Sequence, residues 1–126
     1  MPLTYSQKQG GGVGKMDLSE KRCVPCEGGT PPLGENEIKE FMKAVPVWAL
    51  KNGHLSRSFK FKNFLVAMDF VNSIARLAEE EGHHPDISIH YNRVDLELWT
   101  HAIKGLSEND FILAAKINRL VDKPNH

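Results

Sequence analysis

The chain has 126 residues, a length typical of one folded domain. Its 16 basic and 16 acidic residues cancel, so the chain lacks the basic excess typical of a nucleic-acid-binding protein. No apolar run approaches the roughly 20 residues that a membrane-spanning helix needs. The N-terminus also lacks an apolar segment of the kind found in secretory signals, so we expect a cytoplasmic location.

The first part of the chain is expected to carry little regular structure. Residues 1–20 are polar and glycine-rich, which predicts a flexible tail. Glycine and proline punctuate residues 21–34, which predicts an extended loop and leaves 35–122 as the single domain. Cys23 and Cys26 form a CxxC pair in this loop. A structural role, a metal site and a redox site all stay open for the pair, although zinc would need two more ligands.

Residues 35–45 predict the first helix of the domain. Four apolar residues recur at the i, i+3, i+4 and i+7 spacing of one helical face, and Pro46 is expected to end the helix. These residues are Ile38, Phe41, Met42 and Val45.

Residues 47–62 predict a β-hairpin. The pair Asn52-Gly53 suits the positive φ angles of a type I′ turn. In the second strand, aromatic and basic residues alternate, as expected for a strand with one buried face. The alternating residues are Phe59, Lys60, Phe61 and Lys62.

Residues 63–82 predict a long helix. Asn63 can cap its first turn and Gly82 can close its last. Glu79, Glu80 and Glu81 oppose the helix dipole at its C-terminal end, which suggests that one of them serves a purpose other than stability. The apolar residues at helical spacing are Phe64, Ala67, Met68, Val71, Ile74, Ala75 and Ala78.

Residues 86–101 predict two strands joined by a turn around Asn92-Arg93. The second strand alternates cleanly, which favours a sheet with one face covered by helices. We expect Val94, Leu96 and Leu98 to face the helices, with Asp95, Glu97, Trp99 and His101 on the other face.

The last helix is expected from residue 107 onward. Ser107 and Asp110 match an S-x-x-D cap, and the buried stripe is expected to be Phe111, Ala114, Ala115 and Ile117. The predicted order is therefore α-β-β-α-β-β-α, a small α+β domain.

Histidines are concentrated between Glu81 and His101, which hold four of the chain's six. Pro85 disfavours helix at His84 and steers the chain into an extended turn, where adjacent imidazoles point in different directions. An antiparallel hairpin returns His101, at the end of its last strand, toward His83 and His84. His90 lies nearer the turn and is left out of this group. On spacing alone a structural role, acid–base chemistry and a metal site all remain open.

Three further residues have two possible roles each. Trp99 could wall a pocket, or could belong to the core or to an interface. Asp110 could cap the last helix, or could orient a catalytic group. Glu79 could be a solvated charge, or could lean toward His83, four residues later.

The stretch AEEEGHHPDISIHYNRVDLELWTHAIKGLSENDFILAAKI resembles the signature region of the pterin-4a-carbinolamine dehydratases. The resemblance covers about residues 21–120, including the upstream hairpin and long helix and the CxPC and GGxPPL stretch. The chain departs from some members at Ile87 and Ser88, where those members carry aromatics. The matching positions are Glu79, His83, His84, Pro85, Tyr91, His101 and Asp110.

The resemblance implies a four-stranded antiparallel sheet with helices on one face, assembled as a homo-oligomer (dimer or tetramer). It implies the dehydration of 4a-hydroxytetrahydrobiopterin to quinonoid dihydropterin, which recycles the cofactor of the aromatic amino acid hydroxylases. It implies no metal or organic cofactor, and it makes His83, His84 and His101 the catalytic residues. We expect His84 and His101 to exchange the protons and His83 to bind and assist, with Glu79, Pro85 and Asp110 binding substrate or orienting a histidine.

Two other functions compete with catalysis. The same resemblance allows a protein-binding role, as a dimerisation cofactor of a transcription factor. The residues alone also allow a small metal-binding protein that uses His83, His84 and His101, with Cys23 and Cys26 as further ligands.

Overall fold

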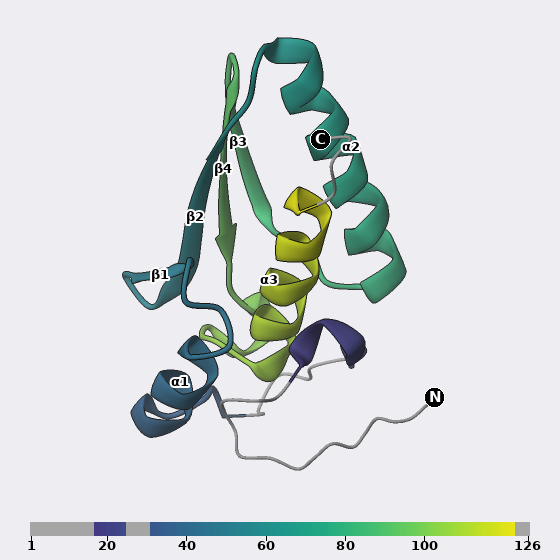
Figure 1. Ribbon diagram of the computed structural model, residues 1–126. Coiled ribbons are helices and arrows are strands. Elements are labelled where there is room, and N and C mark those ends of the chain that lie inside the picture. The colour runs from purple at the N-terminus through teal and green to yellow at the C-terminus, as the bar shows by residue number, and fades with distance from the viewer. Residues whose placement is uncertain (1–16, 25–30, 123–126) are drawn as a thin grey trace.

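The fold is built on a four-stranded antiparallel sheet, and helices α2 and α3 pack on one of its faces (Figure 1). The structure, a computed structural model, describes residues 17–24 and 31–122. Along the chain the order is α-β-β-α-β-β-α, which confirms the predicted α+β class. The strand order in the sheet is β1-β2-β4-β3. The elements are α1 (Glu35–Met42), β1 (Ala49–Lys51), β2 (His54–Lys60), α2 (Phe64–Glu81), β3 (Asp86–His90), β4 (Arg93–Leu98) and α3 (Glu108–Val121).

Helix α1 is shorter than its apolar spacing predicts. It ends at Met42, and a turn leads from Lys43 to the fully buried Val45. Phe41 packs on Phe111 of α3, with ring centroids 5.1 Å apart. The last residue of the predicted stripe therefore enters the core from the turn that precedes Pro46, and not from the helix.

The first hairpin has the turn that its sequence predicts. Lys51 pairs with His54, so Asn52 and Gly53 form a two-residue loop. Both have positive φ, 54° and 80°, as a type I′ turn requires. The expected alternation is confirmed by burial, since Phe59 is buried and Phe61 partly buried while Lys60 and Lys62 are exposed, although β2 itself ends at Lys60. The Phe61 ring still packs against α2, 4.9 Å from the ring of Phe70.

The buried face of α2 differs from the predicted one. Phe70, absent from the predicted stripe, is fully buried, whereas Phe64 and Ala75 are exposed. The helix carries two neighbouring apolar stripes. Because an α-helix has 3.6 residues per turn, the two stripes point in different directions, and only one of them faces the sheet. Asn63 caps the helix as expected, accepting from Val66 N at 2.9 Å. The buried residues of α2 are Ala67, Phe70, Ile74 and Ala78.

The turn between β3 and β4 lies one residue earlier than predicted. His90 pairs with Arg93, so the loop is Tyr91-Asn92 and not Asn92-Arg93. Tyr91 takes the positive φ, 56°, a conformation that a bulky residue rarely adopts. The Asn92 side chain donates to the carbonyl of Phe61 at 2.9 Å, which ties this turn to the end of β2. Within β4 the predicted alternation is confirmed, with Val94, Leu96 and Leu98 buried.

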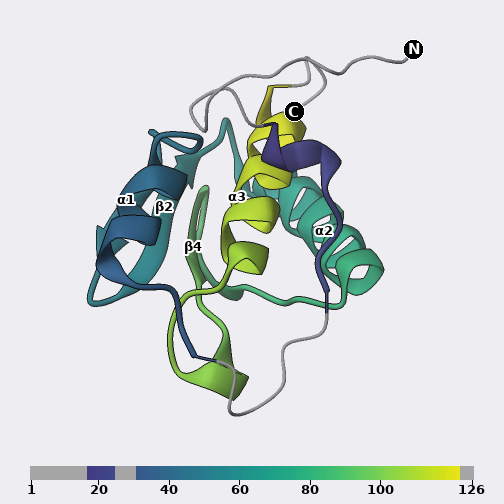
Figure 2. The same ribbon diagram turned by 90° about the horizontal axis from the view of Figure 1, so that it is seen from below.

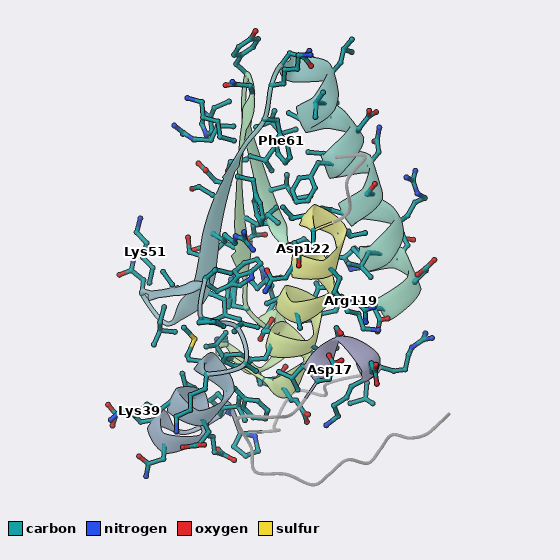
Figure 3. The ribbon with its side chains drawn as sticks, viewed as in Figure 1. Asp17, Lys39, Lys51, Phe61, Arg119 and Asp122 are labelled. Carbon is teal, nitrogen blue, oxygen red and sulfur yellow. The ribbon has the colours of Figure 1, made fainter. Side chains whose placement is uncertain are left out.

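Part of the expected N-terminal tail is folded. Leu18–Glu20 form a 3-10 turn, and Leu18 is almost fully buried in the core. Figure 2 shows this turn beside α3, and Arg119 of α3 donates to Ser19 Oγ at 3.1 Å. Figure 3 places Arg119 and Asp17 at this junction, whereas Lys39 and Lys51 point away from the body. The described end of the expected tail therefore packs on the domain, while residues 1–16 lie outside the described part.

Helix α3 is the central helix of the core. It contacts the 3-10 turn and both other helices, and Phe111, Leu113 and Ile117 are almost fully buried. Ala115, expected in the buried stripe, is only partly buried. In the described residues, no helix is both long and apolar enough to cross a bilayer.

Candidate active site

A cleft of about 340 Å³ lies at one end of the sheet, where α2 leads into β3 and β4 leads toward α3. Its lining residues are Val24, Gly82, His83, His84, Pro85, Asp86, Trp99, Thr100, His101, Ala102 and Asn109. The three histidines expected to converge therefore line one cavity.

The strand register explains this convergence. Asp86 pairs with Glu97, so continuing the ladder past the strand ends sets His84 level with Trp99 and His83 level with Thr100. Gly82 ends α2 in the left-handed conformation, at φ 65°, and turns the chain into this extension. A helix cap and an antiparallel register thus deliver the paired histidines to the cleft.

His83 is held by a buried carboxylate. Its Nε2 lies 2.6 Å from Asp110 Oδ1, and the two side chains are 12% and 0% exposed. The other oxygen, Asp110 Oδ2, accepts from Thr100 Oγ1 at 2.8 Å and from Ser107 N at 3.0 Å. Asp110 is therefore the cap of α3 that the sequence predicts and the partner of His83 as well. In this contact the carboxylate can accept a hydrogen bond from Nε2 of His83.

His84 is held by a different carboxylate, near solvent. Its Nε2 lies 2.7 Å from Glu79 Oε2, with side chains 59% and 79% exposed. The suggestion that Glu79 leans toward His83 is therefore wrong. The left-handed cap at Gly82 changes the chain direction, so helical spacing no longer applies beyond it.

His101 reaches the cleft from a loop, not from a strand end as expected. Strand β4 stops at Leu98, and His101 opens a 3-10 turn that runs to Ile103. Thr100 and Gly105 close this loop, with Thr100 N donating to the carbonyl of Gly105 at 2.8 Å. The His101 side chain is exposed at the cleft rim.

An aromatic column that was not predicted in sequence supports His101. The ring of Trp99 lies 3.8 Å from that of His101 and 4.4 Å from that of His54, centroid to centroid. The indole Nε1 donates to Asp86 Oδ2 at 3.1 Å. Trp99 therefore lines the pocket, which was one of the roles expected for it. His54 and Asp86 gave no local signal, because only the pairing of β2 with β4 brings His54 beside Trp99.

The N-terminal segment forms one wall of the cleft. Val24 N donates to Asn109 Oδ1 at 3.0 Å, and the Asn109 amide donates back to the carbonyl of Val24. One residue earlier, Cys23 N donates to Glu81 Oε1 at 2.9 Å, while Lys116 Nζ reaches Glu81 Oε2 at 2.6 Å. These bonds fix the segment across the end of α2 and the start of α3.

Two groups in this wall have shifted pKa values. Burial, with the Glu81 charge as the next cause, raises the pKa of the Cys23 thiol to about 12. Burial alone would raise the pKa of Glu81, but hydrogen bonds from Lys116 and Cys23 N and nearby positive charges lower it overall. The Cys23 thiol is therefore protonated at neutral pH, which does not favour a redox role for this residue. Cys26 lies outside the described residues.

The remaining candidate residues are spread along the β3–β4 hairpin. Pro85 lines the cleft with the histidines. Tyr91 and His90 lie at the turn, the opposite end of the hairpin, and Ile87 and Ser88 lie on β3 between. Across residues 17–24 and 31–122, no three His, Cys, Asp or Glu side chains are grouped so that they could hold a metal ion.

Fold and site together define a small α+β domain whose cleft presents two histidine–carboxylate pairs and a third histidine whose ring lies against an indole. The sequence model described as Pterin 4 alpha carbinolamine dehydratase matches residues 31–120. A Rubrobacter xylanophilus protein with the provisional name pterin-4-alpha-carbinolamine dehydratase is 49% identical over 105 residues, covering 82% of this chain and 98% of the relative. A Rickettsia canadensis protein with the same provisional name is 52% identical over 102 residues, covering 79% and 94%.

A solved structure agrees with these matches. The Brucella melitensis protein described as a transcriptional coactivator/pterin dehydratase superposes with a TM-score of 0.67 at 38% identity, covering 71% of this chain and 97% of that one. The chain belongs to the pterin-4a-carbinolamine dehydratase family, a family of hydro-lyases.

Proposed function

We propose that this protein dehydrates 4a-hydroxytetrahydrobiopterin to quinonoid dihydropterin by histidine acid–base catalysis. The observation that carries the proposal is that His83, His84 and His101 line one cleft. A volume of about 340 Å³ is within the range of small-molecule sites. Membership of the family supports the substrate class.

The reaction needs two proton transfers at one small ring. Hydroxide leaves carbon C4a poorly unless it is protonated, so a general acid is required, and a general base removes the proton from N5. Imidazole serves in either role near neutral pH. Each transfer of this kind contributes about 10²–10⁴-fold to the rate.

The surroundings of the three imidazoles favour a division of roles. His84 and His101 are exposed at the cleft and can exchange protons with substrate and water, so they are the proposed proton carriers. His83 is nearly buried and held by Asp110, which suits binding and orientation. Glu79 and Asp110 orient His84 and His83 through Nε2, leaving Nδ1 of each ring to act on the substrate.

A dehydratase assay with 4a-hydroxytetrahydrobiopterin tests the proposal. We expect His84→Ala and His101→Ala each to lower kcat by about 10²-fold or more, since each removes one acid or base. His90→Ala is the matched control, because His90 is an exposed histidine on the same hairpin at the far end from the cleft. Its kcat is expected to equal that of the parent. Full activity in the His84→Ala/His101→Ala double variant would refute the mechanism.

The wider setting is also part of the proposal. We place the reaction in tetrahydrobiopterin recycling for aromatic amino acid hydroxylases, in a cytoplasmic homo-oligomer that uses no metal or organic cofactor. Exposed apolar side chains on α2, Phe64 and Leu65, and the position of β3 at a sheet edge support association between copies. Sedimentation equilibrium would measure the oligomer size.

A second candidate function is protein binding, favoured by the words transcriptional coactivator in the description of the Brucella structure. Such a role would use the assembly surface and not the cleft. The His84→Ala/His101→Ala variant separates the two functions, because it is expected to lose catalysis while partner capture in a pull-down is retained.

A further inference from the structure

We propose that Trp99 is a positioning residue for His101, with His54 packed against the indole as its support. The inference rests on the proposed function, since it assigns Trp99 a part in the same proton-transfer chemistry. It adds two residues, Trp99 and His54, to the group that determines the rate.

The indole ring contacts two imidazoles. The His54 ring lies nearly parallel to it, with centroids 4.4 Å apart and an interplanar angle of 11°. The His101 ring lies 3.8 Å away at 32°. Contact between aromatic rings adds attraction beyond the area that they bury, which favours one orientation of an exposed ring.

The position of the indole is itself fixed by the sheet. Leu55 pairs with Leu98, so the next step of the ladder sets His54 opposite Trp99. Asp86, at the start of β3, accepts the indole proton at 3.1 Å. Glu97 lies beside His54, with Oε2 3.1 Å from Nδ1. Groups from three strands therefore hold the column, and the column holds His101.

An aromatic residue in this cleft could stack on the substrate or support a catalytic group. The ring contacts of Trp99 within the described residues are with two histidines, which favours support of His101. The loop that carries His101 begins beyond the end of β4, so the stack is an additional restraint on its imidazole. A misplaced catalytic group lowers the rate of the chemical step more than it weakens substrate binding.

Kinetics separates positioning from substrate stacking. We expect Trp99→Leu to lower kcat about 10–100-fold with KM nearly unchanged, and Trp99→Phe to stay within about threefold of the parent because a phenyl ring still stacks. His54→Ala is expected to lower kcat in the same direction, while His90→Ala, an exposed sheet histidine away from the indole, changes nothing. A Trp99→Leu protein with raised KM and parental kcat would overturn the inference, and His54→Ala repeats the test if Trp99→Leu fails to fold.

A measurement that needs no activity tests the stack directly. The imidazole proton resonances of His101 in the parent are expected upfield of their positions in Trp99→Leu, because the indole ring current shields them. Identical shifts in the two proteins would overturn the inference. If the parent shows no dehydratase activity but the upfield shift is present, the proposed function fails while the positioning of His101 by Trp99 stands.

Discussion

The two histidine–carboxylate pairs of the cleft are alike in chemistry and differ in burial. The pair His83–Asp110 is almost fully buried, whereas His84–Glu79 is mostly exposed. An exposed pair contributes about 0–1 kcal/mol to stability, but removing one partner of a buried pair costs about 3–5 kcal/mol because a desolvated charge is left behind. Two neighbouring histidines should therefore differ sharply in their effect on folding.

We predict that His83→Ala lowers the free energy of unfolding by about 3 kcal/mol, while His84→Ala lowers it by less than about 1 kcal/mol. Urea unfolding followed by circular dichroism measures both. The loss in His83→Ala should be smaller when Asp110 is also replaced by asparagine, since the stranded carboxylate is then gone. Equal stabilities of the two single variants would contradict the burial argument.

The Cys23 thiol is predicted to be unreactive in the folded protein. Its pKa is raised to about 12, first by burial, and the thiolate is the reactive form. In a Cys26→Ser background, iodoacetamide at pH 8 should label the native protein far more slowly than the urea-unfolded protein, as followed by mass spectrometry. Replacing Glu81 with glutamine removes the second cause of the shift and should speed native labelling. Equal labelling rates for native and unfolded protein would contradict the assignment.

Among the elements, the loop carrying His101 is braced by the segment before α1. Leu33 N donates to the carbonyl of Leu106 at 2.8 Å. A Cβ atom added at Gly105 would lie only 2.7 Å from Cβ of Pro32, so the two segments cannot both keep their places around a larger residue. The GGTPPLG stretch, expected to be a plain loop, thus packs at its described end against the loop that carries His101.

We predict that Gly105→Ala lowers the free energy of unfolding by about 1–3 kcal/mol, as overpacking does, and lowers kcat because the loop with His101 must shift. The double variant Gly105→Ala/Pro32→Gly removes the blocking ring and should recover activity. Thermal unfolding and the dehydratase assay measure the two effects. Parental kcat in Gly105→Ala would show that the loop tolerates the displacement.

How well the sequence predicts each element depends on how local its cause is. The Asn52-Gly53 turn, the Asn63 cap and the Ser107–Asp110 cap follow from neighbouring residues and are confirmed. The predicted buried face of α2 is partly wrong because the helix has two apolar stripes. Only packing against the sheet and α3 determines that the stripe with Phe70 is the buried one.

At the level of the whole molecule, the histidine cleft was predictable because hairpin geometry returns a strand to its starting end. Its supports were not. His54 contacts Trp99 only because β2 pairs with β4, although α2 and β3 separate these strands in the sequence. No local sequence pattern predicts that pairing. Leu18 likewise enters the core from a segment whose composition suggests a tail. Residues that hold a site from distant parts of the chain are the ones that sequence spacing does not reveal.

The folded molecule joins its N-terminal segment to its C-terminal helix through the buried Glu81 carboxylate, and this junction should be sensitive to acid. The Glu81 side chain is 4% exposed and bonds to Lys116 and to Cys23 N. Its pKa is lowered in the folded state, so its contribution is fully present above the unfolded value of about 4.3 and is lost as pH falls through the folded value.

We therefore predict that Glu81→Gln lowers the free energy of unfolding by about 1.5–3 kcal/mol at pH 7, as expected for hydrogen bonds to a charged group. The difference between the variant and the parent should shrink below about pH 4.3, where Glu81 of the unfolded parent takes up a proton, until the folded carboxylate is protonated too at its lower pKa. Asp95→Asn is the control, because Asp95 also has a lowered pKa, mainly from the Ser58 hydrogen bond, but is much more exposed, so its effect should be smaller. Urea unfolding between pH 3 and 7 measures all three proteins. A difference between Glu81→Gln and the parent that stays constant over this pH range would show that the Glu81 charge does not stabilise the junction.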